Sequence, residues 1–94
     1  MYRAIGARLG EANVYQSLGR LTEDETWFEQ AIALHTQISD SYSVAADKFY
    51  FGLVLQKKNE PERALAMFND AITIFQRIGL PQYVEMVRKQ IASE

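Results

Sequence analysis

The sequence predicts an all-α fold in which antiparallel helical hairpins stack side by side and a last helix caps the carboxyl end. Three observations predict this class. Apolar residues recur every three or four positions along most of the chain, which is the spacing of one face of a helix. The two prolines, Pro61 and Pro81, stand where a helix can begin. No stretch alternates polar and apolar residues long enough to predict a strand.

The helices are expected to be joined by links of two to five residues, which force neighbours to lie antiparallel. Thr22 and Glu25 have the spacing of a capping box, which starts a helix. Ser39-Asp40-Ser41 supplies a turn and a cap for the next helix. The expected helices cover about residues 8–18, 23–38, 42–58, 61–78 and 81–92, with Gly19-Arg20-Leu21 as the first turn.

Composition excludes several classes of protein. The chain has 94 residues, enough for one domain, and 48% of them are hydrophobic, which excludes a disordered tail. Twelve acidic against ten basic residues give a net charge of −2, the wrong sign for a protein held by nucleic acid phosphates. There is no cysteine, so disulfides and thiolate metal sites are excluded. With no apolar run that could span a membrane, we expect a cytoplasmic protein.

The chain repeats itself at an offset of 40 residues. The offset places the second expected helix on the fourth and the first on the third, which indicates two stacked helical hairpins. The matched pairs are Phe28 and Phe68, Ala31 and Ala71, Ile32 and Ile72, Ile38 and Ile78, Ala12 and Gly52, Val14 and Val54, and Gln16 and Gln56.

At these positions the chain resembles the tetratricopeptide repeat family, whose hairpins set small residues of one helix against an aromatic residue of the other. The residues that carry the resemblance are Gly52, Leu55, Ala64, Phe68 and Ala71 in the second hairpin and Ala12, Tyr15, Phe28 and Ala31 in the first. Asp24 departs from the family's usual alanine, which predicts a splayed first hairpin or a late start of its second helix. The 40-residue spacing exceeds the family's usual length of about 34.

The resemblance implies one domain, residues 1–94, built as a right-handed solenoid. Repeat one would cover about residues 8–38, repeat two about 42–78, and a capping helix about 81–92. In this family the first helices of the hairpins line a concave groove that receives a peptide or a helix. The groove positions carried over to this chain are Asn13, Gln16, Ser17, Ala46, Phe49, Leu53, Gln56 and Lys57.

We therefore expect a protein–protein interaction scaffold that binds a peptide or an amphipathic helix of another polypeptide in an apolar groove. We expect no enzyme activity, catalytic residue, cofactor or metal site. His35, the single histidine, stands at the position of Phe75 and is expected to be a partly buried packing residue. The acidic run Glu23-Asp24-Glu25 suits the first turn of a helix better than a metal site.

Three alternatives stay open. In the first, the chain is a self-associating segment of a larger regulatory protein, and it forms a homodimer with Tyr15, Phe49 or Leu53 in or near the contact. In the second, the chain is a sensor or an enzyme accessory domain. Residues 1–6 also resemble the end of a second helix with its glycine stop, as in residues 75–79, which would make the chain a piece of a longer array. If Met1 is a true start, the first helix reaches back past Gly6 instead.

Overall fold

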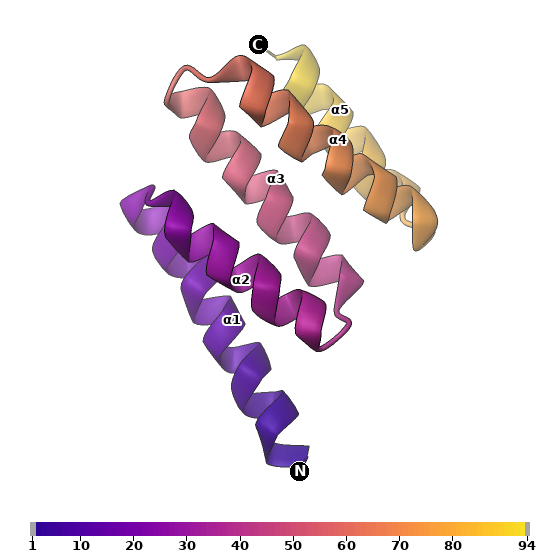
Figure 1. Ribbon diagram of the computed structural model, residues 1–94. Coiled ribbons are helices and arrows are strands. Elements are labelled where there is room, and N and C mark those ends of the chain that lie inside the picture. Colours follow the sequence, from indigo (N-terminus) through magenta and orange to yellow (C-terminus); the bar gives the residue numbers. More distant parts are fainter. Residues whose placement is uncertain (1, 94) are drawn as a thin grey trace.

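The computed structural model describes residues 2–93, and side chains from Ala7 onward. This part of the chain forms five α-helices and no strand (Figure 1). None of the five is long and apolar enough to cross a membrane. The helices are α1 (Tyr2–Thr22), α2 (Glu25–Gln37), α3 (Ser41–Lys57), α4 (Pro61–Arg77) and α5 (Pro81–Ala92).

The helices form two layers. In Figure 1, α2 and α4 lie in front, and α1, α3 and α5 lie behind them. Each helix packs on the next along the chain, and α1 also contacts α3 within the rear layer. The stack measures 44 × 31 × 15 Å, so it is a flat body with two broad faces. The rear face, made by α1, α3 and α5, is where the predicted groove belongs.

The core lies around α3, which is covered on several sides, as its apolar sequence requires. Its aromatic rings meet those of both neighbouring helices: Phe51 stacks on Phe28 of α2 at 5.2 Å between ring centres, and Phe49 lies 5.8 Å from Phe68 of α4. The buried core residues are Phe28, Ala45, Phe49, Phe51, Val54, Leu55, Ala64, Phe68, Ala71, Phe75, Val84 and Val87.

Two glycines give these aromatic rings their room. A Cβ atom added at Gly52 would lie 2.6 Å from the ring of Phe68, and one added at Gly19 would lie 2.8 Å from the ring of Phe28. Both glycines are buried. Gly19, rather than the predicted Ala12, therefore holds in the first hairpin the place that Gly52 holds in the second. The second helices repeat at 40 residues, but the first helices repeat at 33, close to the usual length of the family.

The predicted bounds of the first helix, residues 8–18, are wrong at both ends. α1 is continuous from Tyr2, so it reaches back past Gly6, and it runs through Gly19 to Thr22 instead of turning there. Gly19 therefore does not end the helix. It lies within α1, where its lack of a side chain leaves room for the ring of Phe28. The expected late start of the second helix is confirmed, since α2 begins only at Glu25.

The predicted capping box does not form. Thr22 belongs to the last turn of α1, where its hydroxyl donates to the carbonyl of Leu18 at 2.7 Å. Asp24 caps α2 instead, because its carboxylate accepts the backbone N–H of Thr26 at 3.0 Å. The predicted cap before α3 is confirmed: Asp40 accepts the backbone N–H of Ser43 at 3.1 Å.

All four linkers contain one residue in the left-handed backbone region. In three linkers, the residue after the left-handed one donates its backbone N–H to the carbonyl five residues earlier, at 2.9 Å. This Schellman arrangement satisfies one of the last carbonyls of the helix. Of the four positions, one carries the glycine that usually marks such an ending. The residues are Glu23 (φ 61°), Ser39 (57°), Asn59 (62°) and Gly79 (77°).

Replacing Ser39 by glycine is expected to raise the free energy of unfolding by about 0.5–1 kcal/mol. The left-handed conformation costs a residue with a side chain about 1–2 kcal/mol, and the extra freedom of glycine in the unfolded chain offsets part of that gain. Asn59→Gly is the matched control, with a smaller gain because asparagine tolerates this conformation. Urea unfolding measures both variants, and a Ser39→Gly variant less stable than the wild type would contradict the prediction.

Candidate functional site

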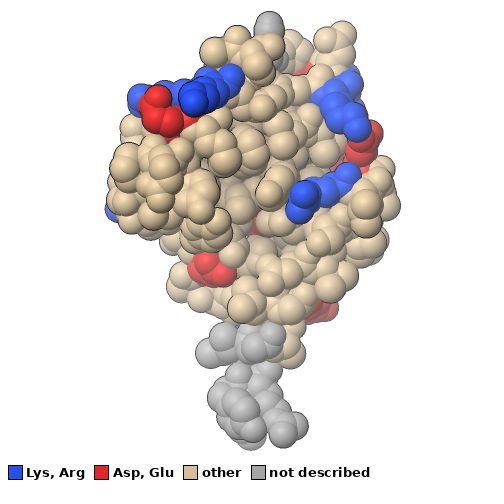
Figure 2. All heavy atoms as spheres, turned by 180° about the vertical axis from the view of Figure 1, so that it is seen from behind, with Lys and Arg blue, Asp and Glu red and all other residues tan. Residues whose placement is uncertain are grey.

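The predicted groove residues lie on the rear face of the stack. Figure 2 shows this face, where a basic side chain lies just right of the centre and most other charged side chains lie nearer the edges. Phe49 departs from the prediction: only 9% of its surface is exposed, and its ring packs on Phe68, so it belongs to the core. The other seven predicted residues keep half-buried or exposed side chains, and they are Asn13, Gln16, Ser17, Ala46, Leu53, Gln56 and Lys57.

Tyr50 and Leu53 form the apolar centre of this face. Both are half-buried on α3 and line one pocket together with Arg20, Glu23 and Lys57. The guanidinium carbon of Arg20 lies 4.1 Å from the centre of the Tyr50 ring, a cation–π contact. Lys57 pairs with Glu23 across the two hairpins. The pocket therefore joins an apolar surface to fixed charges at its edge.

Arg20 and Tyr50 are site residues that sequence reasoning missed. Arg20 was assigned to a turn, but it lies in the last part of α1 because that helix continues through Gly19. The 33-residue offset was the available signal, since it places Arg20 on Leu53, which the sequence did predict.

A pair of amides joins α3 to α5 at the other side of the face. The side-chain nitrogen of Gln90 donates to the side-chain oxygen of Gln56 at 2.7 Å. The side-chain nitrogen of Gln56 donates in return to the backbone carbonyl of Gln90 at 3.3 Å. Gln56 thus closes the groove toward α5 with its hydrogen-bonding groups already engaged.

A buried polar cluster lies between α1, α2 and α3. His35 and Asp47 are both fully buried, and Nδ1 of His35 lies 2.6 Å from Oδ2 of Asp47. The other ring nitrogen, Nε2, lies 3.1 Å from Oδ1 of Asn13. Nε2 of Gln16 donates to Oδ1 of Asp47 at 2.6 Å. The prediction that His35 is a partly buried packing residue is therefore wrong. His35 is completely buried, and both of its ring nitrogens have hydrogen-bond partners.

The carboxyl group of Asp47 is held between opposing influences. Burial raises its pKa, because a carboxylate loses solvation in the interior, while the bonds from His35 and Gln16 lower it. With both ring nitrogens engaged and no exposed surface, His35 has no open atom for a substrate. The cluster therefore orients Asn13 and Gln16, two of the residues predicted to line the groove, and is not placed for acid–base chemistry.

Charged residues also tie together the tips of the two hairpins. Glu25, predicted to complete a capping box, instead pairs with Arg63 of α4 at 2.6 Å and with Lys58 at 3.5 Å. The bond from Arg63 holds the pKa of the Glu25 carboxyl below its ordinary value. Glu60 is 3.0 Å from the same guanidinium. These contacts orient one hairpin on the other.

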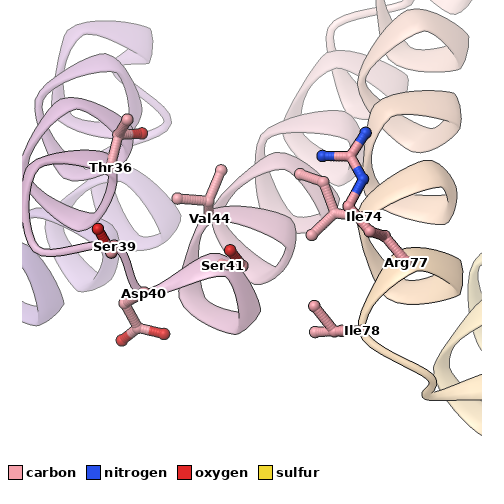
Figure 3. Close-up of a pocket in the computed structure, with 8 residues that line it drawn as sticks. All are labelled: Thr36, Ser39, Asp40, Ser41, Val44, Ile74, Arg77 and Ile78. Carbon is pink, nitrogen blue, oxygen red and sulfur yellow. The ribbon is translucent and has the colours of Figure 1, made fainter.

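A second hollow lies between the end of α2, the beginning of α3 and the end of α4 (Figure 3). Its one carboxylate, Asp40, already accepts both the N–H and the hydroxyl of Ser43 as the cap of α3. One arginine, three hydroxyl side chains and three aliphatic side chains complete the lining. The lining residues are Thr36, Ser39, Asp40, Ser41, Val44, Ile74, Arg77 and Ile78.

Comparison with known proteins gives one family. Residues 3–77 match the family described as tetratricopeptide repeat, and this range is more than half of the chain. Neither the curated proteins nor the solved structures contain a match.

Proposed function

The chain belongs to the tetratricopeptide repeat family, and from this premise we propose that it binds another polypeptide on the face formed by α1, α3 and α5. Repeats of this family generally mediate protein–protein interactions and generally act as non-catalytic scaffolds. One observation carries the choice of face: Tyr50 and Leu53 present half-buried apolar surface in its middle, framed by Arg20 and Lys57. Apolar and aromatic centres with polar edges are the usual anatomy of a binding surface.

The charges of the pocket predict the partner's chemistry. Lys57 is already paired with Glu23, but Arg20 lies on the Tyr50 ring and has no carboxylate partner within the described residues. A partner that fits would insert an apolar side chain over Leu53 and place a carboxylate beside Arg20. An acidic residue next to an apolar anchor, in a peptide or on an amphipathic helix, meets both needs.

Leu53→Glu is expected to weaken the binding of peptides by at least about tenfold, because it removes the apolar surface at the centre and places a carboxylate beside Arg20, where the partner's own carboxylate should bind. Peptides would be selected from a random displayed library on the immobilised chain, and affinities measured by isothermal titration calorimetry. Leu65→Glu is the matched control, since Leu65 is exposed on α4 in the front layer. Circular dichroism checks that both variants remain helical. Selected peptides that tolerate Leu53→Glu and lose binding with Leu65→Glu would place the site on the other layer and refute the proposal.

A second candidate function is self-association through the free side of α1. The 33-residue offset places Val14 on Asp47 and Leu21 on Val54. Asp47 and Val54 are 0% and 5% exposed beside α2, while Val14 and Leu21 are 56% and 82% exposed. An apolar surface at a position that is covered elsewhere in the stack favours a partner there. We take a second copy as that partner, because one two-fold contact would cover Val14 and Leu21 of both copies at once.

Leu21→Glu is expected to convert the dimer into a helical monomer, because two copies of the charge would meet across the two-fold axis. Sedimentation velocity over concentrations up to about 100 µM reports the mass. Leu53→Glu should leave the mass unchanged, since this contact does not involve the groove, and Phe49 is already enclosed within one copy. A wild-type chain that sediments as a monomer throughout this range excludes self-association.

A further inference from the structure

The buried cluster leaves one end of each of two groove amides open. Gln16 gives its nitrogen to Asp47, and Asn13 gives its oxygen to His35. Within the described residues, no buried side-chain nitrogen or oxygen lacks a hydrogen-bond partner. The side-chain oxygen of Gln16 has no such partner, so it is open to solvent. Asn13 is an exposed residue, and its amino group has no hydrogen-bond partner among the described residues, so it is open to solvent.

The distances show where protons can lie in the pair. One proton lies between Nδ1 of His35 and Oδ2 of Asp47, on either atom, because two lone pairs would not approach to 2.6 Å. Nε2 faces the carbonyl oxygen of Asn13 at 3.1 Å, and an oxygen can only accept. With the Asn13 amide in this orientation Nε2 carries a proton too, and with the amide turned Nε2 accepts instead. In this arrangement His35 and Asp47 together hold two protons.

Loss of one proton to water changes what Asn13 can do. The proton between Nδ1 and Oδ2 remains, because it is shared by two strong acceptors, so Nε2 is the atom that loses its proton. Nε2 then has a lone pair facing the lone pairs of the Asn13 oxygen. Asn13 relieves this by turning its amide through about 180°, so that its amino group donates to Nε2. Its carbonyl oxygen then faces the groove.

We propose that the protonation of the His35–Asp47 pair sets which end of the Asn13 amide faces the groove. With two protons in the pair the groove receives a hydrogen-bond donor at Asn13, and with one proton it receives an acceptor. Gln16 does not turn, because Oδ1 of Asp47 accepts its N–H in both states. The consequence for binding rests on the proposed function, since a backbone carbonyl of a bound peptide fits the first state and a backbone N–H fits the second.

Few charges surround the pair within the described residues. α1 faces it with two uncharged amides, Asn13 and Gln16. The charge from outside the pair that acts on Asp47 is Asp40, at the beginning of α3, which opposes a second negative charge. Lys48, next to Asp47 along α3, is engaged by Asp70 of α4 at 3.1 Å.

Nuclear magnetic resonance of the isotope-labelled chain over pH tests the proposal without a ligand. Long-range correlations of the His35 ring report the proton on Nε2, and side-chain amide signals report Asn13 and Gln16. We expect the Asn13 signals to shift with the same midpoint as Nε2, while the Gln16 signals stay almost constant. Asn13 signals that do not follow Nε2 would overturn the proposal. It is overturned equally if Nε2 keeps its proton over the whole pH range in which the chain is folded.

The double variant His35→Phe with Asp47→Val is the matched control. The 40-residue offset places these two positions on Phe75 and Val87, which are buried in the α4–α5 contact, so the replacements suit the same geometry. The Asn13 signals should then be independent of pH. A pH-dependent shift that persists in the double variant would assign the change to another group.

A binding measurement separates this inference from the proposed function. For a selected peptide that needs Asn13, the affinity of the wild type should change about 2- to 10-fold across the midpoint, the value of one hydrogen bond, and the double variant should show no such change. If peptides bind in the groove but the Asn13 amide does not turn, the inference fails and the proposed function stands. If the amide turns but no selected peptide depends on Leu53, the proposed function fails and the inference stands.

Discussion

Replacing His35 by alanine is expected to lower the free energy of unfolding by about 3–5 kcal/mol, because a buried polar group loses its partner and a cavity is created at the same place. Asp47 would stay fully buried with only Gln16 to bond, and a cavity would replace the imidazole ring. The sequence alone predicted a slight effect, because His35 was taken for a packing residue. Urea unfolding followed by circular dichroism measures the change.

Two further variants decide whether the loss comes from the pair. Asp47→Ala should destabilise by a similar amount, because His35 then loses the partner of Nδ1. The double variant His35→Phe with Asp47→Val should recover most of the stability, since replacing both partners of a buried pair with well-packed apolar residues is often neutral or stabilising. Losses that simply add in the double variant would show that the two residues act independently.

Phe68→Ala is expected to cost about 3–5 kcal/mol, the range for a large core aromatic side chain. Phe68 is fully buried, and its ring fills the space that Gly52 leaves open on α3. Phe28→Ala should cost a similar amount, because Phe28 is equally buried and rests on Gly19 in the same way. The same unfolding measurement applies to both variants.

Leu65→Ala provides the control for these two variants. Leu65 lies on α4, three residues before Phe68, but 41% of its surface is exposed, so its loss should stay within about 1 kcal/mol. A loss below about 0.5 kcal/mol at Phe28 or Phe68 would contradict their equivalence as the paired core aromatics of the two hairpins.

The sequence predicted the second hairpin well, because its small and aromatic residues are regularly spaced and Pro61 marks the start of α4. The first hairpin was harder, since the matching letters Val14 and Val54 suggested a 40-residue offset for both helices. In the structure Val14 is exposed and Val54 is buried, so identical residues stand in different environments. The register of α1 differs mainly because α2 begins only three residues before Phe28, whereas α4 begins seven residues before Phe68. Periodicity alone does not reveal where a helix begins.

The predicted groove face was found partly through the family resemblance, but the polar cluster beneath it was not. His35 and Asp47 lie on different helices, and only packing brings their side chains together. A signal did exist: the 40-residue offset aligns this polar pair with the apolar pair Phe75 and Val87. Two polar residues that replace two apolar ones at a shared interface indicate a contact between them. Read singly, each looked like an isolated exception.

The α2–α3 interface is polar at His35 and Asp47, while the α4–α5 interface is apolar at Phe75 and Val87. This difference also specifies which helices pack together. Suppose that α3 of one copy took the place of α5 on α4 of another copy. Asp47 would then be buried against Phe75, and its carboxyl group would lose the partner that His35 supplies. If α5 were to stack on α2, His35 would face Val87 and lose its carboxylate in turn. Each wrong neighbour leaves a buried polar group unpaired, while the apolar contacts alone would accept either order. We therefore expect the polar pair to disfavour an exchange of hairpins between two copies of the chain.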